Sequence, residues 1–434
     1  MNKNNFTLIE HSFIFVGKEP KQNGNNIEVS QNIFDEIKKF VLSNAEEDDN
    51  SIINFLIPSY KKGYGEILKA NNYVGIIQTK NGVTIEILPK IYESSKNESL
   101  ENTKKIFLRM LRKLRKSPFK ITNFANLNLS KMPLLDVFIN MFLDEVDKLI
   151  KKGLRKAYVQ KSENLFALKG KLNFNKNIQQ NLIHKERFFV EYDEFDVNRP
   201  ENKLIKSTLI FLQKKARANF TQQRVRKLTF IFDEISKSTN IDKDFTKCKS
   251  NRLLKHYENI LIWCRIFLKN QTFSNYKGND IAFALLFPME RIFEDYVASW
   301  LRKNIDTNIQ LKTQKVIGHL LNNNKYKMKP DIVINNGQII ADTKWKILDD
   351  KHKMTQSDLY QIYAYATKPH ADDNSKEETK KIILIYPYTD NFPTAAEYQF
   401  SEYKNLTIFP FDISKSFEDD YFDNFNDLLK DTII

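Results

Sequence analysis

The sequence predicts an α+β chain of several domains, with a β-rich region at residues 1–95, a mainly helical region at 96–275 and a C-terminal α/β domain at 276–434. Three observations support this division. Short apolar runs separated by polar clusters fill the first region, apolar residues recur at helical spacing in the second, and strand patterns alternate with helical patterns in the third. A chain of 434 residues has room for two or three domains.

Five short runs in the first region have the composition of β-strands. They are SFIFVG, NIEVS, IINFLIPS, YVGIIQT and VTIEILP. The polar stretch ESSKNESLENTKK then separates this predicted β domain from the helical region, which only KGKLNF and RFFVEYDEF interrupt. Two basic stretches, Lys104–Lys116 and Lys151–Lys161, interleave cations with apolar residues and predict helices with a cationic face. Such a face is either solvated or contacts phosphates.

The third region predicts elements in the order helix, strand, strand, strand, helix and strand. They are the amphipathic helix Phe283–Lys303, the strand Asn308–Gly318, a hairpin around the turn Asn335–Gly337, a helix capped by Thr355 with Asp358 at its third position, and the apolar strand Lys380–Tyr388.

The predicted hairpin carries Pro330-Asp331 and, eleven residues later, Asp342-Thr343-Lys344. Because side chains alternate along a strand, Asp342 and Lys344 share one face, and Asp331 begins the partner strand. Two carboxylates attract a hard cation such as Mg²⁺, and a lysine beside them offsets charge on a phosphoryl group. Since an acid-x-base triplet arises about eight times by chance in such a composition, a surface hairpin with ordinary charges is the alternative.

The motif and its order of elements resemble the PD-(D/E)xK nuclease superfamily, and Gln361–Tyr365 is similar to the QxxxY element of its RecB-like branch. Four further phrases, together with the motif, resemble the McrC family, the nuclease subunit of McrBC-type 5-methylcytosine restriction systems. They are NYVGIIQTKNGVTIEILPKI, PLLDVFINMFLDEVDKLIKKGLRKAYV, ENLFALKGKLNF and YDEFDVNRPENKLIKSTL. The resemblance covers most of the chain and implies a restriction-endonuclease-like fold for residues 276–434.

The resemblance implies that Asp331 and Asp342 hold Mg²⁺, with Mn²⁺ as an alternative ion, and that Lys344 is the catalytic lysine. Glu294 matches the helical glutamate that assists in many of these nucleases. Glu290 lies close to it in the sequence, and either residue is otherwise an ordinary solvated helix charge.

Two residues of the QxxxY element, Gln361 and Tyr365, would orient the lysine or touch DNA. A capped amphipathic helix explains them as well. Lys346 shares the predicted face of Lys344 and is either a phosphate contact or a solvated lysine.

The resemblance also implies partners. These are double-stranded DNA and an McrB-like AAA+ GTPase ring, whose GTP hydrolysis the amino-terminal region would stimulate in phage defence. The loop Pro58–Gly65 is a candidate contact with the ring, or an ordinary hairpin turn. Two alternatives stay open, namely a GTPase-activating adaptor with a vestigial nuclease site and a free-standing RecB-like repair nuclease.

Composition limits the other classes of function. A formal net charge of +14 favours a polyanionic partner. Cys248 and Cys264 form no metal-binding motif, which indicates a reducing, cytoplasmic setting without structural zinc. Apolar runs are too short for a membrane span. Neither a Walker-type loop nor GxGxxG is present, so nucleotide hydrolysis is expected of a partner.

Overall fold

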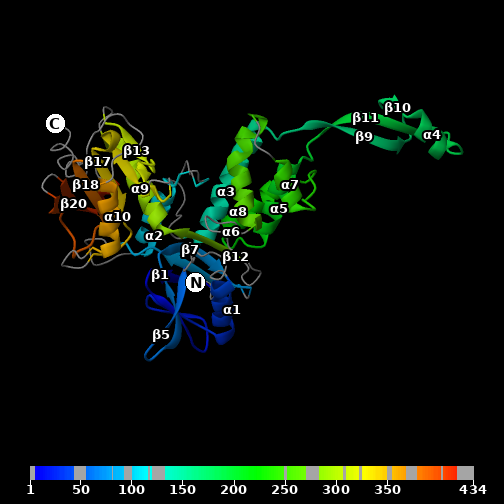
Figure 1. The fold of residues 1–434 in the computed structure, drawn as a ribbon. Helices are drawn as coiled ribbons and strands as arrows, with labels where there is room; N and C mark the ends of the chain where they lie inside the picture. Colours follow the sequence, from blue (N-terminus) through cyan, green and yellow to red (C-terminus); the bar gives the residue numbers. More distant parts are fainter. Residues whose placement is uncertain are drawn as a thin grey trace. The chain divides into compact units, whose positions relative to one another are not determined.

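The computed structural model describes residues 5–43, 55–80, 82–91, 100–115, 118–119, 132–248, 252–269, 283–305, 309–321, 325–348, 354–367, 379–401 and 404–417. The chain forms two compact units (Figure 1). The first unit comprises residues 1–131 and 272–434, and the second comprises residues 132–271. Most of the polar stretch predicted to link the first two regions lies outside the described residues.

Two small sheets form the N-terminal domain of the first unit. One has the strand order β3-β4-β2-β6-β5, and the other has the order β1-β8-β7-β12. The strands are β1 Asn5–Ile9, β2 Phe13–Val16, β3 Lys21–Asn23, β4 Asn26–Val29, β5 Leu56–Lys61, β6 Gly65–Ala70, β7 Tyr73–Gln78, β8 Thr84–Leu88 and β12 Phe283–Pro288. Helix α1 (Gln31–Ser43) shares an apolar core with both sheets. The five strands predicted here are confirmed, although the first residues of IINFLIPS lie outside the described part.

The prediction of one helix over Phe283–Lys303 is wrong at its start. Phe283–Pro288 is strand β12, antiparallel to β7, and helix α9 begins at Met289 and ends at Asn304. A proline has no N–H for a helix interior, and the apolar run before it suits a strand buried on both faces. Gly75 on β7 has φ 140° and leaves no room for a Cβ beside the carbonyl of Leu285, so only glycine allows this pairing. The N-terminal sheet is therefore completed by residues from the third predicted region.

The C-terminal domain is built on a sheet of order β13-β16-β17-β18-β20-β19. Its strands are β13 Leu311–Thr313, β16 Ile332–Ile334, β17 Ile339–Thr343, β18 Lys381–Pro387, β19 Ala396–Ser401 and β20 Lys404–Phe411. The strands β17, β18 and β20 are parallel, and all seven residues of β18 are buried. A separate pair, β14 (Gly318–His319) and β15 (Lys327–Met328), follows β13.

Two helices pack against opposite faces of this sheet. Residues of α10 (Gln356–Thr367) join the core formed by Val333, Ile340 and Leu384. Side chains of α9 instead contact Phe411, whose ring lies 5.2 Å from that of Trp300. The predicted order of helix, three strands, helix and strand is confirmed. The predicted strand Asn308–Gly318 is shorter in the structure, because Gln314 ends β13 with a left-handed φ of 54°.

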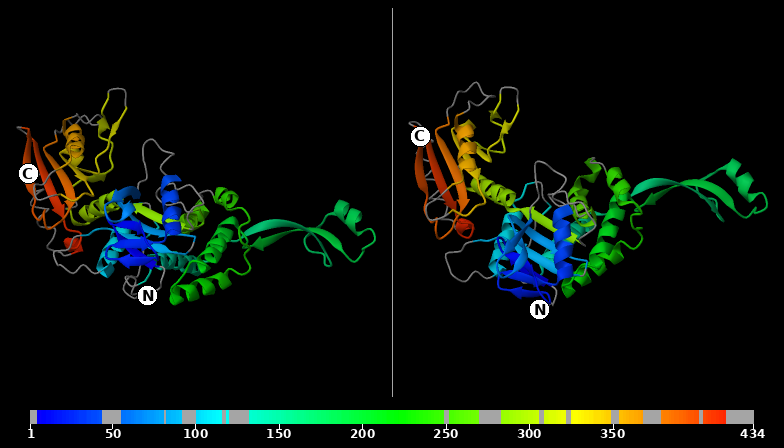
Figure 2. Two further views of the ribbon diagram at one scale, coloured as in Figure 1. Left: turned by 90° about the horizontal axis from the view of Figure 1, so that it is seen from below. Right: turned by 60° about the horizontal axis from the view of Figure 1, so that its bottom comes forward.

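The second unit combines a helical body with an extended arm of residues 157–196 (Figure 2). The body contains α3 Leu134–Lys152, α5 Pro200–Gln213, α6 Asn219–Ile231, α7 Ile241–Lys247 and α8 Glu258–Lys269. The arm contains β9 Ala157–Leu165, β10 Lys171–Leu172, α4 Phe174–Asn181 and β11 Phe188–Asp196. Asn202 joins the two, since its Nδ2 donates to the carbonyls of Arg155 (3.0 Å) and Val197 (2.7 Å) at the base of the arm.

The basic stretch Lys151–Lys161 is not the predicted helix. Helix α3 ends at Lys152, Gly153 follows with φ 90°, and strand β9 begins at Ala157. A left-handed glycine at this position ends a helix, and the alternating residues after it suit a strand. The stretch Lys104–Lys116 is mostly helical as predicted, since α2 spans Leu100–Leu111. Lys104 is buried there and forms an ion pair with Glu86, at 2.9 Å, so this helix is more than a solvated cationic face.

None of the helices in the described residues is both long enough and apolar enough to span a membrane.

Candidate active site

The hairpin of β16 and β17 brings Asp331 and Asp342 to the same end of the C-terminal sheet. Ile332 pairs with Ala341, so the two acids lie next to each other across the strands. The turn requires left-handed backbone, which Asn335 (φ 45°), Asn336 (φ 55°) and Gly337 (φ 114°) supply. The local sequence therefore dictates the register that places these two carboxylates together.

Both carboxylate oxygens of Asp331 accept hydrogen bonds. Its Oδ2 accepts hydrogen bonds from the backbone N–H of Thr343 (2.8 Å) and from the Thr343 hydroxyl (2.7 Å). Its Oδ1 accepts from Nε2 of Gln314 (2.9 Å). These bonds fix the direction in which the Asp331 carboxylate points.

Lys344 connects the hairpin to helix α10. Its Nζ lies 2.6 Å from Oδ2 of Asp342 and donates to Oε1 of Gln361 at 2.7 Å. Nε2 of Gln361 in turn donates to the hydroxyl of Tyr365 at 2.8 Å. Gln361 and Tyr365 lie one helical turn apart, so one face of α10 orients the lysine.

Glu294 reaches the same cavity from helix α9. Its Oε1 accepts a hydrogen bond from Nε2 of Gln314 (2.6 Å) and lies 2.5 Å from a guanidinium nitrogen of Arg115. Gln314 therefore bridges Glu294 and Asp331. Arg115 also pairs with Asp295 and donates to the hydroxyl of Thr313 at 3.0 Å.

Gln314 and Arg115 were not predicted from the sequence. Gln314 belongs to no sequence motif. In the structure its backbone is left-handed, a conformation that costs a non-glycine residue free energy, and its side-chain amide donates to Glu294 and Asp331. Arg115 belongs to a basic stretch that predicted a cationic helix face. It lies after the end of α2 and reaches residues about 180 positions away.

These side chains line a cavity of about 760 Å³. Its walls include residues from α9, β17 and α10 and from the segments beside β13 and α2. Among them are Arg115, Glu294, Gln314, Asp331, Asp342 and Lys344.

Burial and mutual repulsion raise the pKa values of the two hairpin acids. Burial raises the pKa of Asp331 to about 6, with a further increase from the charge of Glu294 and an opposing effect of Thr343. Burial also raises the pKa of Asp342 to about 6, helped by Asp331 and opposed by Lys344. For Lys344, burial lowers the pKa, but the charges of Asp342, Asp358 and Asp331 outweigh it and raise the pKa above the ordinary value. Buried acids that repel one another are typical of a site that binds a cation.

The donor set fits a hard divalent cation that retains water. Asp331 and Asp342 offer carboxylate oxygens, the ligands that Mg²⁺ prefers, and Mg²⁺ commonly takes only one or two carboxylates from a protein. The described residues contain no group of three or more His, Cys, Asp or Glu side chains arranged to hold a metal ion. Glu294, another acid of the cavity, is engaged by Arg115 and Gln314.

Lys346 and Glu290, for which the sequence left two interpretations open, each bind a partner outside the hairpin acids. Lys346 is not a free solvated lysine, because its Nζ contacts both carboxylate oxygens of Asp358 at 2.9 Å. Glu290 accepts a hydrogen bond from Nδ2 of Asn72 at 3.0 Å and so binds the N-terminal domain. Both also line the cavity, as do five of the six predicted site residues. The sixth, Tyr365, does not line it and accepts a hydrogen bond from Gln361.

Comparisons with known proteins agree with this architecture. The type IV methyl-directed restriction enzyme EcoKMcrBC of Escherichia coli (strain K12) is 23% identical over 286 residues, which is 61% of this chain and 80% of that relative. A similar fold occurs in a refined half-complex from the tetradecameric assembly of Thermococcus gammatolerans McrB AAA+ hexamers with bound McrC. The TM-score is 0.67 at 18% identity, covering 98% of this chain and 100% of that chain.

A family model described as McrBC 5-methylcytosine restriction system component matches residues 68–387. This match spans well over half of the chain, including part of the N-terminal domain, the whole second unit and the hairpin with its acids. The chain therefore belongs to the family of McrBC 5-methylcytosine restriction system components.

Proposed function

We propose that this chain is the Mg²⁺-dependent DNA endonuclease subunit, of the McrC type, in a GTPase-driven and modification-dependent restriction complex for phage defence. The observation that carries the proposal is the convergence of Asp331, Asp342 and Lys344 in one cavity, with the lysine ammonium held between Asp342 and Gln361. Two carboxylates and a lysine in this arrangement suit the hydrolysis of a phosphodiester.

Each side chain has a role in this proposal. Asp331 and Asp342 would hold the metal, and Mn²⁺ would substitute for Mg²⁺. When bound, the ion polarises the phosphoryl group and lowers the pKa of a water molecule. Lys344 places its positive charge next to the phosphate, and Gln361 orients it. The network of Arg115, Gln314 and Glu294 keeps the opposite wall of the cavity in place.

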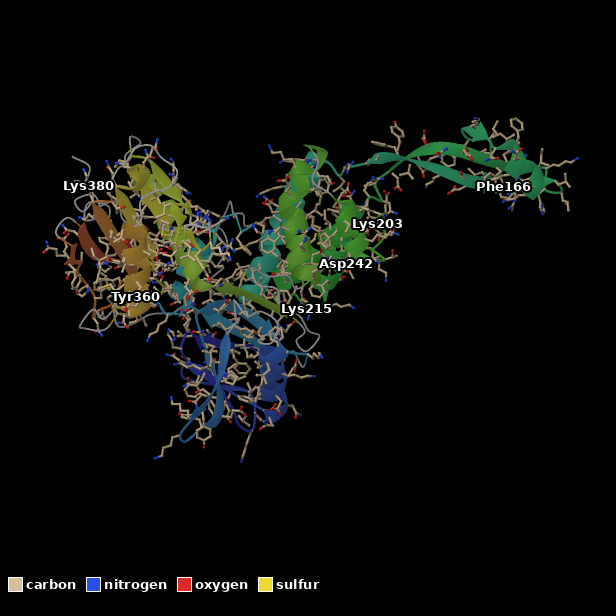
Figure 3. The ribbon with its side chains drawn as sticks, in the orientation of Figure 1. Phe166, Lys203, Lys215, Asp242, Tyr360 and Lys380 are labelled. Carbon is tan, nitrogen blue, oxygen red and sulfur yellow. The ribbon has the colours of Figure 1, made fainter. Side chains whose placement is uncertain are left out.

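The proposed macromolecular partners are double-stranded DNA and an McrB-like AAA+ GTPase ring. The relative from Thermococcus gammatolerans was solved with AAA+ hexamers and supports the second partner. The arm offers a surface for such a contact, because apolar side chains at its outer end are exposed. Phe166, labelled there in Figure 3, is 69% exposed and Ile183 is 87% exposed. The loop Pro58–Gly65, which includes the turn between β5 and β6, stays a second candidate contact.

The decisive experiment measures DNA cleavage by the full-length chain assembled with its AAA+ partner, GTP and Mg²⁺. Asp342→Asn and Lys344→Ala should each lower the cleavage rate by at least about 100-fold and leave stimulation of GTP hydrolysis intact. Lys380→Ala is the matched control, because this exposed lysine, labelled in Figure 3, immediately precedes β18 and does not line the cavity.

Three results would contradict the proposal. Cleavage by Lys344→Ala at the wild-type rate would exclude this site. A wild-type complex that stimulates GTP hydrolysis without cutting any DNA would favour the adaptor with a vestigial site. Cutting by the isolated chain without any GTPase would favour the free-standing nuclease.

A further inference from the structure

Trp345, the residue after Lys344, connects the C-terminal domain to the N-terminal domain. Its indole Nε1 donates to the carboxylate of Glu10, at 3.0 Å from Oε1 and 3.2 Å from Oε2. Glu10 follows strand β1 and is only 1% exposed. Glu10, near the start of the chain, therefore contacts the residue that directly follows the proposed catalytic lysine in the sequence.

The N-terminal domain fixes Glu10 independently of Trp345. The backbone N–H of Glu10 donates to the carbonyl of Leu88 (3.0 Å), and the N–H of Lys90 donates to Oε2 of Glu10 (2.9 Å). The following turn is closed by a hydrogen bond from the N–H of Ser12 to the carbonyl of Ile9, with His11 at φ 69°. Glu10 thus presents its carboxyl group from a rigid position.

Trp345 is buried, and both packing and a hydrogen bond hold its indole. Its ring lies 5.3 Å from that of Phe293 on α9. It also lines both the site cavity and a second cavity of about 280 Å³, which Glu10 lines as well. The hydrogen bond to Glu10 is a directional contact of the indole N–H and helps to set the orientation of the ring.

We propose that Glu10 is a positioning residue that orients Lys344 through Trp345, and this inference rests on the nuclease function proposed above. Strand β17 ends at Thr343, and beyond it the N–H of Lys344 donates to the carbonyl of Ile385 (2.9 Å). Anchoring the next side chain restricts rotation of the backbone at Lys344, and hence the direction of its ammonium group. A misplacement of about 1 Å at a reacting group costs about 100-fold in rate.

The chemistry of Glu10 suggests which substitution preserves the contact. Burial raises the pKa of Glu10 to about 8, while hydrogen bonds from Lys90 and Trp345 lower it and the charge of Glu290 raises it. Near neutral pH the group is therefore mostly a neutral acid that accepts hydrogen bonds. A glutamine amide oxygen reproduces that acceptor, whereas leucine does not.

The kinetic test uses the full complex with its AAA+ partner. Glu10→Leu and Trp345→Phe should each lower kcat for DNA cleavage about tenfold or more with little change in KM, and Glu10→Gln should retain most of kcat. Trp300→Phe is the matched control, because it also removes a buried indole N–H, here bound to the carbonyl of Ser416 at 2.8 Å, on helix α9. Wild-type kcat in Glu10→Leu, or a loss no larger than that of Trp300→Phe, would overturn the inference.

A spectroscopic test does not depend on cleavage. The chain has three tryptophans, and the ¹⁹F resonance of 5-fluorotryptophan at position 345 is identified by its loss in Trp345→Phe. Glu10→Leu should shift this resonance and leave that of Trp300 in place, while Mn²⁺ affinity stays within about twofold because Asp331 and Asp342 are untouched. An unshifted Trp345 resonance overturns the inference even if the wild-type complex cuts no DNA, a result that would separately refute the proposed function.

If Glu10→Leu does not fold, kcat of the double variant Glu10→Gln/Trp345→Phe tests the inference instead. Its kcat should equal that of Trp345→Phe alone when Glu10 acts through Trp345. Independent losses that add would overturn the inference.

Discussion

Replacing Glu10 by glutamine should change how the stability of the first unit depends on pH. Burial disfavours the charged form of this carboxyl group and raises its pKa from the ordinary value of 4.5 to about 8. The backbone N–H of Lys90 and the indole N–H of Trp345 donate to it. Glu290 raises its pKa, and His11, Lys90 and Lys346 are the titratable side chains that line the same small cavity. Glutamine keeps the shape and an acceptor oxygen but does not titrate.

The sign follows from proton binding. An acid whose pKa is raised in the folded state binds more protons when folded than when unfolded, so its stabilising contribution is complete below pH 4.5 and is lost as pH rises to about 8. At 1.36 kcal/mol per pKa unit, the loss is on the order of 3 to 5 kcal/mol. The Glu10→Gln variant should therefore gain stability relative to the wild type as pH rises from 5 to 8, and the difference should level off above about pH 8.

The assay is urea unfolding of both proteins between pH 5 and 9, followed through the ¹⁹F resonance of Trp345, which reports on the first unit. Taking the difference between the two proteins removes contributions from titrating groups that both share. A difference in the free energy of unfolding that stays constant across this range would refute the reasoning, and so would one that shrinks as pH rises.

Four further predictions concern the cavity and the arm. Gln314→Gly should lower Mn²⁺ affinity about tenfold in calorimetry, because it removes the amide that bridges Glu294 and Asp331. Unchanged affinity would contradict the bridging role. Arg115→Ala should destabilise the first unit by about 3 kcal/mol in urea unfolding, since it leaves the buried carboxylate of Asp295 without its guanidinium partner, and Arg115→Lys should recover part of this loss. An equal free energy of unfolding for Arg115→Ala and the wild type would contradict this prediction. Thr343→Val should weaken Mn²⁺ binding about tenfold with little effect on folding, because only the hydroxyl contact to Asp331 is lost. Ile183→Asp should abolish co-purification with the AAA+ partner without lowering Tm, and retained binding would exclude the outer end of the arm as the contact.

The hairpin with its acids could be predicted because its information is local. The left-handed Asn335 and Asn336 close the turn, and apolar residues on both sides specify two strands. Once the register is set, Asp331, Asp342 and Lys344 must lie close together. The helix carrying Gln361 and Tyr365 was predictable for a similar reason, since a capping threonine and a helical apolar stripe lie within twelve residues of each other.

The errors share a physical cause. Phe283–Pro288 has an apolar pattern that suits either a helix or a buried strand, and the choice is made by pairing with β7, about 200 residues away in the chain. The strand β9 of the arm is decided by its antiparallel partner β11 and by Gly153. In both cases a long-range hydrogen-bonded partner outweighs the local preference.

By itself, the sequence determined the α+β class, the hairpin and the placement of the three residues of the proposed catalytic centre, because periodicity and turn chemistry act over short distances. Only the tertiary structure decided the surroundings of that centre. Arg115, Gln314 and Glu10 reach it from distant segments, and their bonds to Glu294, Asp331 and Trp345 depend on which surfaces meet after the chain has folded. Buried charges need partners, and no local pattern specifies which distant side chain provides them.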